Sequence, residues 1–356
     1  MKMTLPAVLA GLLLLTQVGF TSAQNINGAG STAAAPIFQS WAQAYKKTTG
    51  IDLTYEAIGS SAGLKKIRAL ETQFGASDVS PSDAELVKDG LLVFPVAITG
   101  ISPVVNLPKV SDGQLRLTGD VLARIFLGEI TQWNDPEIVK QNTGSTLPEI
   151  PIKVVVRADG SGTTYNFSDY LAKSSPTWKA KNGAKSSFTW PTNFVSAKGS
   201  DGIVKAVKET PGAIGYVDYS YVKANTLMTI QLKNQDGEFT KPSIFAFRSA
   251  LNGSEWVSKG SFTSTLTDQP GKGAWPITMG TFVVLPKTAE HPDQAVRVLK
   301  FFVWAFVNGD ALVHENNFVR LPDRVQALAF KAISSVKDKA GNAIGMTLLV
   351  AAGSPS

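Results

Sequence analysis

The chain has 356 residues, of which 44% are apolar and 17% charged, and this balance excludes an intrinsically disordered protein. It contains no cysteine, which excludes disulfides, thiolate catalysis, thiolate metal sites and a lipid-modified cysteine. The net charge of +6 is not gathered into a basic run, and no nucleic-acid-binding motif is present, so we expect no nucleic-acid partner.

Residues 1–23 have the pattern of a secretory signal peptide. Lys2 supplies a positive start, residues 5–20 are mostly apolar, and small residues at 21–23 offer a cleavage site near Ala23. A membrane anchor is the alternative, but the apolar run is short and small residues follow it at once. We therefore expect a mature chain with a net charge of +5 that is soluble outside the cytoplasm, most simply in a periplasm.

The mature chain alternates short apolar strands with amphipathic helices, which indicates an α/β fold. The elements expected in the first block are a helix from Pro36 with Phe38, Trp41, Ala42 and Tyr45 on one face, a strand at 51–59, a helix at 60–70, a buried strand at 74–78 and a helix that starts with a capping box at Ser82–Glu85.

A middle block begins near Ile98, and a strong strand at 275–286 follows it. The block contains a helix around 118–128, a glycine-rich turn, a strand at 212–219 and a polar, turn-rich stretch at 232–273. A helix at 292–309 then places Val296, Leu299, Phe302, Val303 and Phe306 on one apolar face. The apolar tail from 344 is compatible with a packed strand and with a frayed terminus.

Four stretches share one pattern, in which a strand end is followed by glycine with serine or threonine and then by a helix. They are residues 28–36, 58–63, 74–78 and 157–164. Helix N-termini expose unpaired N–H groups with partial positive charge, hydroxyls add donors, and glycine lets the backbone approach closely. Plain N-capping explains any single stretch. Four such stretches, one with an arginine at its base, favour a shared anion site.

Nucleotide and catalytic sites each lack a required residue. Residues 28–33 lack the last glycine of a dinucleotide fingerprint, and there is no Walker lysine. Asp159 and Thr163 stand where a nucleophile elbow needs glycines. The only histidines, His291 and His314, are far along the chain and are expected to be solvent-exposed. We therefore expect neither a catalytic triad nor a metal site.

Seven segments at 28–36, 55–63, 74–83, 157–167, 212–219, 275–278 and 299–305 together resemble the periplasmic phosphate-binding protein of bacterial ABC phosphate importers. The resemblance runs in order over about residues 26–338. It implies a type II periplasmic-binding-protein architecture of two α/β domains, each a mixed sheet flanked by helices, with the ligand in the inter-domain cleft. The implied limits are 24–97 plus 275–344 for domain I, 98–274 for domain II and 345–356 for the tail.

The resemblance also implies the residues that contact phosphate. Ala33 stands where the family often carries phenylalanine; its contact is a backbone N–H, so the contact is retained while the cleft wall changes. Asp159 matches the carboxylate that holds and partly neutralises the arginine. The implied contacts are Thr32, Ala33, Ser60, Asp78, Arg157, Ser161, Gly162 through its N–H, and Thr163.

Asp78 is the lone acceptor in this set of donors. A carboxylate repels an oxyanion unless a proton lies between them, and phosphate keeps at least one O–H near neutral pH whereas sulfate has none. Asp78 is therefore expected to select phosphate over sulfate. Its alternative role is an N-cap of the helix that follows.

The implied function is that of a non-catalytic, monomeric receptor, without a cofactor, that delivers inorganic phosphate to an inner-membrane ABC permease. A phosphohydrolase is the main rival, and it would require clustered metal ligands or an activated nucleophile. An adhesin or structural surface protein would leave the concentrated anion donors unexplained.

Overall fold

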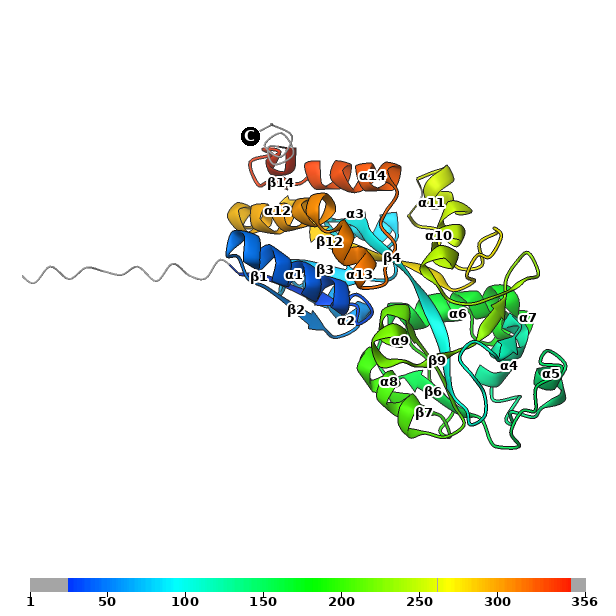
Figure 1. The fold of residues 1–356 in the computed structure, drawn as a ribbon. Helices are drawn as coiled ribbons and strands as arrows, with labels where there is room; N and C mark the ends of the chain where they lie inside the picture. The colour runs from blue at the N-terminus through cyan, green and yellow to red at the C-terminus, as the bar shows by residue number, and fades with distance from the viewer. Residues whose placement is uncertain (1–24, 261, 347–356) are drawn as a thin grey trace, which may run out of the picture.

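The computed structural model describes residues 25–260 and 262–346. The expected signal peptide at 1–23 and residues 347–356 of the expected tail therefore lie outside the described residues. The described chain forms two lobes that meet along one long strand, β4 (Leu91–Asn106) (Figure 1).

The first lobe is a sheet with helices on both faces. Its strands are β1 (Ile26–Gly30), β2 (Leu53–Ala57), β3 (Phe74–Ser77) and β12 (Thr278–Pro286), and β13 (Thr288–Ala289) pairs with β14 (Lys337–Asp338) at its margin. Its helices are α1 (Ala35–Thr49), α2 (Ser60–Arg68), α3 (Asp83–Asp89), α12 (Pro292–Asn308), α13 (Asp310–Glu315) and α14 (Asp323–Ser334). Because β1 runs parallel to β2 and β3 while β12 runs antiparallel to β3, the sheet is mixed.

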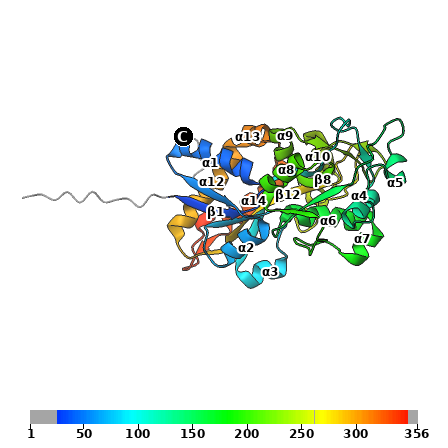
Figure 2. The ribbon, with the colours of Figure 1, turned by 90° about the horizontal axis from the view of Figure 1, so that it is seen from below.

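Apolar side chains fill both faces of this sheet. On one face, the rings of Phe38, Phe74 and Phe302 pack together between the sheet, α1 and α12. On the other face, Ile67 of α2 packs with Val284 of β12. The view in Figure 2 accordingly shows α1 on one side of β1 and α2 with α3 on the other.

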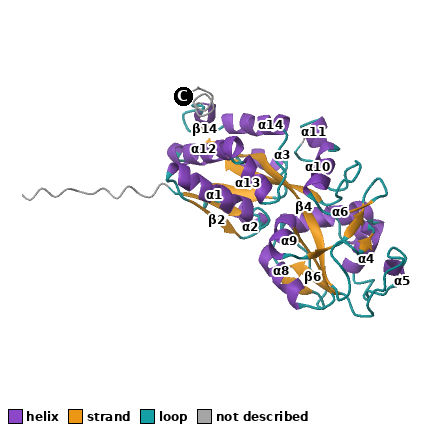
Figure 3. Cartoon of the chain, in the orientation of Figure 1, coloured by secondary structure: helices purple, strands orange, loops and turns teal. Residues whose placement is uncertain are grey.

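The second lobe repeats this arrangement with other elements. Its strands are β6 (Lys153–Arg157), β7 (Val195–Ala197), β8 (Ala213–Asp218) and β9 (Met228–Thr229), and β5 (Arg116–Leu117), β10 (Gln231–Lys233) and β11 (Phe239–Thr240) form a small separate sheet. Its helices are α4 (Gly119–Phe126), α5 (Pro136–Val139), α6 (Gly162–Ser174), α7 (Pro176–Lys181), α8 (Gly199–Glu209) and α9 (Tyr219–Asn225). Two further helices, α10 (Ile244–Asn252) and α11 (Glu255–Ser258), follow (Figure 3).

Strand β4 belongs to the sheets of both lobes. Residues 91–100 pair with β12 of the first lobe, and residues 101–106 pair with β8 of the second. The resulting strand order is β2-β1-β3-β12-β4-β8-β6-β7. The expectation of two α/β lobes, each a mixed sheet flanked by helices, is confirmed, and the two sheets share a strand.

Most elements expected in the first block are confirmed. Helix α1 buries Phe38, Trp41, Ala42 and Tyr45, and the capping box joins Ser82 to Glu85 in both directions. The expected apolar face of α12 is partly wrong, because Val296 is half-buried whereas Val298 and Phe301 are buried. Helix α12 contacts α1, α14 and β1, so its apolar face is wider than a single stripe.

The stretch at 232–273 is more ordered than its polar composition indicates. Helices α10 and α11 bury Phe247 and Trp256. The Trp256 ring lies 5.2 Å from the Phe282 ring of β12. The Phe247 ring lies against Gly100 of β4, so these two aromatic residues anchor the stretch to β12 and β4.

Candidate anion-binding site

The four loops that share the strand–glycine–hydroxyl pattern converge where the two lobes meet. The Ser61 N–H donates to the Gly160 carbonyl at 3.3 Å, which joins the second loop to the fourth. A Cβ added at Gly162 would lie 2.6 Å from Ser60 Oγ and 2.8 Å from Asp78 Cβ. The N-terminus of α6 therefore lies directly against Ser60 and Asp78 of the other lobe.

Helices α2 and α6 follow two of these loops, and their N-termini direct backbone N–H groups at the junction. Helix α2 starts at Ser60 after Gly59, whose φ of 95° suits glycine and whose added Cβ would lie 2.7 Å from Asp159 Oδ2. Helix α6 starts at Gly162, with Ser161 as N-cap accepting from the Thr164 N–H at 3.2 Å. The N–H groups of Gly162 and Thr163 belong to the first turn of the helix and have no carbonyl partner within it. This turn can therefore bind an anion.

Arg157 is a buried cation held by a two-point ion pair. Its Nε donates to Asp159 Oδ1 at 2.7 Å and its Nη2 to Asp159 Oδ2 at 2.5 Å. Burial raises the pKa of Asp159, but the hydrogen bonds and charge of Arg157 outweigh it and hold that pKa below its ordinary value. The Gly199 N–H donates to Asp159 Oδ1 at 3.0 Å. The guanidinium is thus fixed in one plane, with three of its five N–H groups not used by Asp159.

Asp78 is a carboxylate with only 2% of its surface exposed. Ser31 Oγ donates to its Oδ2 at 2.6 Å, and Thr281 Oγ1 donates to its Oδ1 at 3.1 Å. Its own N–H donates to Ser60 Oγ at 3.3 Å. Burial raises the pKa of Asp78 to about 6, while these hydroxyls and the charge of Arg157 act against that rise. Asp78 is therefore mainly ionised at neutral pH and accepts hydrogen bonds.

Three contacts cross between the lobes around the first loop and Asp78. Thr32 Oγ1 lies 2.9 Å from Ser200 Oγ, and the Tyr221 hydroxyl donates to the Thr32 carbonyl at 2.9 Å. The Asn166 side-chain amide donates to the Asp78 carbonyl at 2.7 Å. Each contact joins an element of the first lobe to a helix of the second, so the lobes are closed upon one another.

The structure brings every residue of the predicted site to this junction. Ala33 is fully buried just before α1, and the hydroxyl residues of the site are buried at the loop ends. Whether each contacts a ligand stays a prediction. The members brought together are Thr32, Ala33, Ser60, Asp78, Arg157, Ser161, Gly162 and Thr163, with Asp159 beside the arginine.

Sequence reasoning missed five polar residues at the junction. Ser200 could have been found, because a strand, Gly199, Ser200 and then a helix repeat the pattern of the four loops. Ser31 stands in the first of the four loops, directly after Gly30, but was not singled out there. The remaining three have no such local signal, since their partners are distant in the chain. They are Asn166, Tyr221 and Thr281.

Asp218 is a second buried carboxylate near this site, at the end of β8. It is fully buried and accepts from Thr99 Oγ1 of β4 at 2.7 Å and from the Ser220 N–H at 2.9 Å. Burial raises the pKa of Asp218 to about 7; its hydrogen bonds oppose that rise and the charge of Asp78 adds to it. Asp78 and Asp218 are therefore two buried carboxylates close enough to interact, and burial raises the pKa of each.

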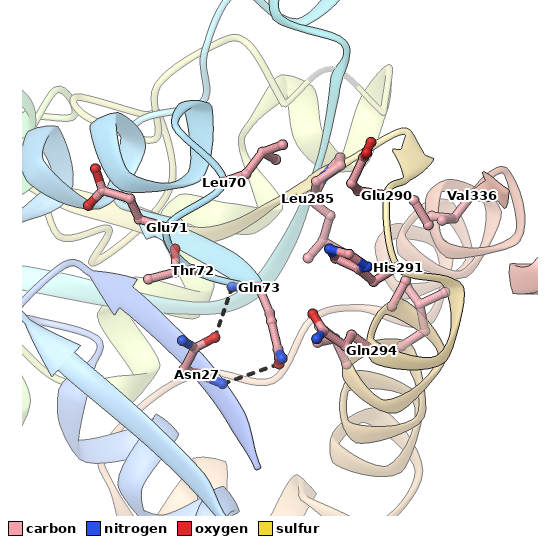
Figure 4. A pocket seen from close by; sticks show the side chains of 15 residues that line it. Asn27, Leu70, Glu71, Thr72, Gln73, Leu285, Glu290, His291, Gln294 and Val336 are labelled. Carbon is pink, nitrogen blue, oxygen red and sulfur yellow. Dashed lines mark hydrogen bonds between the residues drawn. The ribbon is translucent and has the colours of Figure 1, made fainter. Parts of the chain in front are cut away.

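A separate pocket of about 340 Å³ lies at the opposite ends of β1 and β3 (Figure 4). Asn27 and Gln73 pair there by mutual hydrogen bonds, and Glu71, Glu290 and His291 also line it. Its two carboxylates disfavour an anion, so it does not compete with the junction as the anion site. His291 and His314 are both exposed, as expected.

Within residues 25–260 and 262–346, no cluster of three or more histidine, aspartate or glutamate side chains could hold a metal ion. Among the helices of these same residues, none combines the length and apolar character needed to cross a membrane.

Comparison with known proteins places these features in a family. The family model described as the PBP superfamily domain matches residues 16–306. The phosphate-binding protein PstS of Pasteurella multocida is 43% identical over 91% of this chain and 94% of the relative. The phosphate-binding protein PstS of Haemophilus influenzae is 42% identical over 87% of this chain and 93% of the relative.

Solved structures share the fold at lower sequence identity. A high-affinity periplasmic phosphate-binding protein, PfluDING, bound with phosphate, has a TM-score of 0.69 at 20% identity, covering 93% of this chain and 99% of that one. A phosphate-binding protein from Stenotrophomonas maltophilia has a TM-score of 0.66 at 20% identity. The match covers 86% of this chain and 92% of that one.

Proposed function

The chain belongs to the PstS family of phosphate-binding proteins, and on this premise we propose that it binds inorganic phosphate between its two lobes for import by an ABC permease. One observation carries the proposal. Across the junction, the buried Arg157 and the N-terminus of α6 lie opposite Ser60 and Asp78. Donors from both lobes thus surround one acceptor, which is the arrangement that a protonated oxyanion requires.

Each proposed contact has a distinct chemical role. Arg157 supplies a permanent charge and a planar pair of donors, and Asp159 keeps that plane fixed. The first turn of α6, with Ser161, Gly162 and Thr163, supplies N–H and O–H donors. The first lobe contributes the hydroxyls of Thr32 and Ser60 and the backbone N–H of Ala33.

Asp78 supplies the selectivity for the ligand. Near neutral pH phosphate retains at least one O–H, which can donate to an ionised Asp78. Sulfate has no proton to donate, so its lone pairs would face those of a buried carboxylate. Arsenate also carries a proton and is expected to bind.

The transport role sets where and how the chain works. We assign residues 24–97 plus 275–344 to domain I and 98–274 to domain II, with β4 and β12 at the junction and α10 and α11 packed against it. The chain is exported to the periplasm after cleavage near Ala23 and acts as a monomer. Phosphate contacts from both domains favour the closed state, which the permease then recognises.

A receptor fits the site better than an enzyme. Every polar group assigned here binds, orients or neutralises, and none is paired with a base that would activate it as a nucleophile. The two exposed histidines lie at the start of α12 and in α13, apart from the four loops.

Isothermal titration of the mature chain with phosphate and with sulfate tests the proposal. We expect one phosphate per chain, and sulfate binding at least about a hundredfold weaker. Absence of phosphate binding, or equal affinity for both anions, would overturn it. Release of phosphate from a chromogenic monoester in proportion to the amount of protein, and lost in Arg157→Ala, would favour the phosphohydrolase.

A further inference from the structure

Both oxygens of the Asp78 carboxylate are already bonded to hydroxyls of the protein's own first lobe. Ser31 donates to Oδ2 at 2.6 Å from the loop before α1. Thr281 donates to Oδ1 at 3.1 Å from β12. Both hydroxyl residues are as deeply buried as Asp78 itself, with 1% and 0% of their surface exposed. Solvent therefore cannot replace either hydrogen bond easily.

The direction of the Ser31 hydroxyl is set by its second contact. Its oxygen accepts the Ala34 N–H at 3.3 Å, at the start of α1. This contact engages a lone pair of Ser31 and leaves the hydroxyl hydrogen for Asp78. The Tyr55 hydroxyl donates to the Ser31 carbonyl at 2.8 Å and holds the same loop in place.

Thr281 is placed by an irregularity in the sheet. The pairing of β12 with β4 shifts register between Thr281 and Phe282. Such bulges re-aim a side chain relative to a regular strand, and they are frequent near functional sites. The Thr281 side chain reaches Asp78, which follows β3, the other neighbour of β12 in the sheet.

Two donors on one carboxylate have a definite chemical effect. An ionised carboxylate only accepts, whereas the neutral acid carries a proton on one oxygen and becomes a donor there. Each carboxylate oxygen has two lone-pair sites, so each still has one for a ligand O–H beside its hydroxyl partner. Hydroxyl donors bond more strongly to the charged carboxylate than to the neutral acid. They therefore favour the ionised form against the burial that disfavours it.

We propose that Ser31 and Thr281 are positioning residues that determine specificity, because by donating to both oxygens of Asp78 they keep it a pure acceptor that admits only a ligand carrying its own proton. The inference rests on the proposed function and deepens it. Asp78 alone would be expected to gain a proton in this buried setting and then to donate to fully ionised anions such as sulfate. The two hydroxyls prevent that change of role.

Other charged and titratable groups also face Asp78, and their effects have opposite signs. The cation of Arg157 on β6, itself partly neutralised by Asp159, favours ionised Asp78. The carboxylate of Asp218 on β8 opposes it. Tyr55 on β2 keeps its proton throughout the neutral range, because burial raises its pKa well above the ordinary value. The hydroxyls of Ser31 and Thr281 are uncharged donors, so they can be removed without a change in formal charge.

The test uses Thr281→Val, which is nearly isosteric but lacks the hydroxyl. Thr281→Ser keeps the hydroxyl and is the matched control. Ser31→Ala removes the other hydroxyl and is an independent variant. Phosphate and sulfate affinities are measured by titration calorimetry from pH 5.5 to 8.5. For Thr281→Val and Ser31→Ala we expect the phosphate-to-sulfate affinity ratio at pH 7 to fall roughly tenfold, with sulfate binding extended to higher pH. Thr281→Ser is expected to follow the parent profile. An unchanged ratio in both hydroxyl-deletion variants would overturn the inference.

A second measurement separates this inference from the proposed function. Carbon-13 NMR of protein labelled at the aspartate carboxyl carbons follows ionisation of Asp78 without ligand, with its signal assigned by its loss in Asp78→Asn. Asp218→Asn identifies the neighbouring signal. We expect the Asp78 midpoint to rise by about one pH unit in Thr281→Val and not in Thr281→Ser. If the parent fails to bind phosphate, the proposed function fails, and this titration still decides whether the hydroxyls control Asp78.

Discussion

Asn166 of α6 donates its side-chain amide to the backbone carbonyl of Asp78 at 2.7 Å, so a helix of one lobe is bonded directly to the acceptor loop of the other. The same amide donates to the Gly162 carbonyl at 3.0 Å, one turn earlier in α6. The Tyr221 hydroxyl makes a similar bridge to the Thr32 carbonyl. The closed arrangement is therefore held by protein contacts as well as by any ligand between the lobes.

Tyr221→Phe removes one of these bridges and keeps the ring. A neutral hydrogen bond contributes about 0.5–1.5 kcal/mol, so we expect phosphate affinity to fall about two- to tenfold, mainly through faster release. Stopped-flow release kinetics would measure it. Tyr219→Phe on the same helix is the matched control, because its ring packs on Phe247 of α10. Equal release rates in both variants would contradict the bridging role.

Arg157→Lys keeps the charge but loses the planar fork that Asp159 holds. A charge-assisted hydrogen bond contributes about 1.5–3 kcal/mol, so we expect phosphate affinity to fall at least about tenfold, and further in Arg157→Ala. Titration calorimetry gives both values. Arg124→Lys, at a partly exposed arginine of α4, is the control. If Arg157→Ala binds phosphate with an affinity within about threefold of that of the parent, the loss of binding free energy is under ~0.7 kcal/mol. That result would exclude Arg157 as a ligand contact.

Phosphate should shift the chain toward the closed arrangement, because the proposed donors are divided between the lobes. A ligand that bridges them stabilises the closed state by the contacts it makes only there. Small-angle scattering should therefore show a smaller radius of gyration with phosphate, and no change with sulfate at the same concentration. Identical profiles under conditions where calorimetry shows saturation would place the ligand outside the junction.

The stability of the fold should depend on pH through Asp218. Its pKa is raised from 3.8 to about 7, so the neutral form is the one that the folded state favours. Its contribution to stability is full below about pH 4 and is lost as the pH rises through 7. Asp218→Asn cannot ionise and can still accept from the Ser220 N–H. We expect the difference in melting temperature between Asp218→Asn and the parent to increase as the pH is raised from 5 to 8. The increase should be about 2–4 °C for each kcal/mol of unfolding free energy that the parent loses. A difference that is constant over this range would contradict the raised pKa.

The sequence predicted the parts of the site that depend on local pattern. A strand end, a glycine and a hydroxyl before a helix are neighbours in the chain, so the loops around Ser60 and Ser161 could be found from spacing alone. The α/β class followed from the alternation of strands and helices, whereas the two-domain architecture came from the family resemblance. The assignment of single residues such as Thr32 came from family resemblance and not from spacing.

The remaining parts depend on tertiary contacts that no local pattern reveals. Thr281 lies in an apolar strand and looks like core until β12 is placed beside β3. Tyr221 and Asn166 are ordinary helix residues until the lobes meet. Helices α10 and α11 were missed for the same reason, since Trp256 of α11 has its partner, Phe282, in β12.

The phosphate-to-sulfate affinity ratio of Asp78→Asn, measured by competition titration beside the parent, tests the central claim most directly. Asparagine has nearly the same shape but presents an N–H donor where Asp78 accepts. A site built around a ligand O–H can reject an analogue that lacks it by roughly 10⁴-fold in favourable cases. We predict that the variant binds phosphate more weakly and sulfate more tightly, so that the ratio falls by at least about tenfold. A variant that excludes sulfate as strongly as the parent would contradict the claim that Asp78 selects the ligand by its proton.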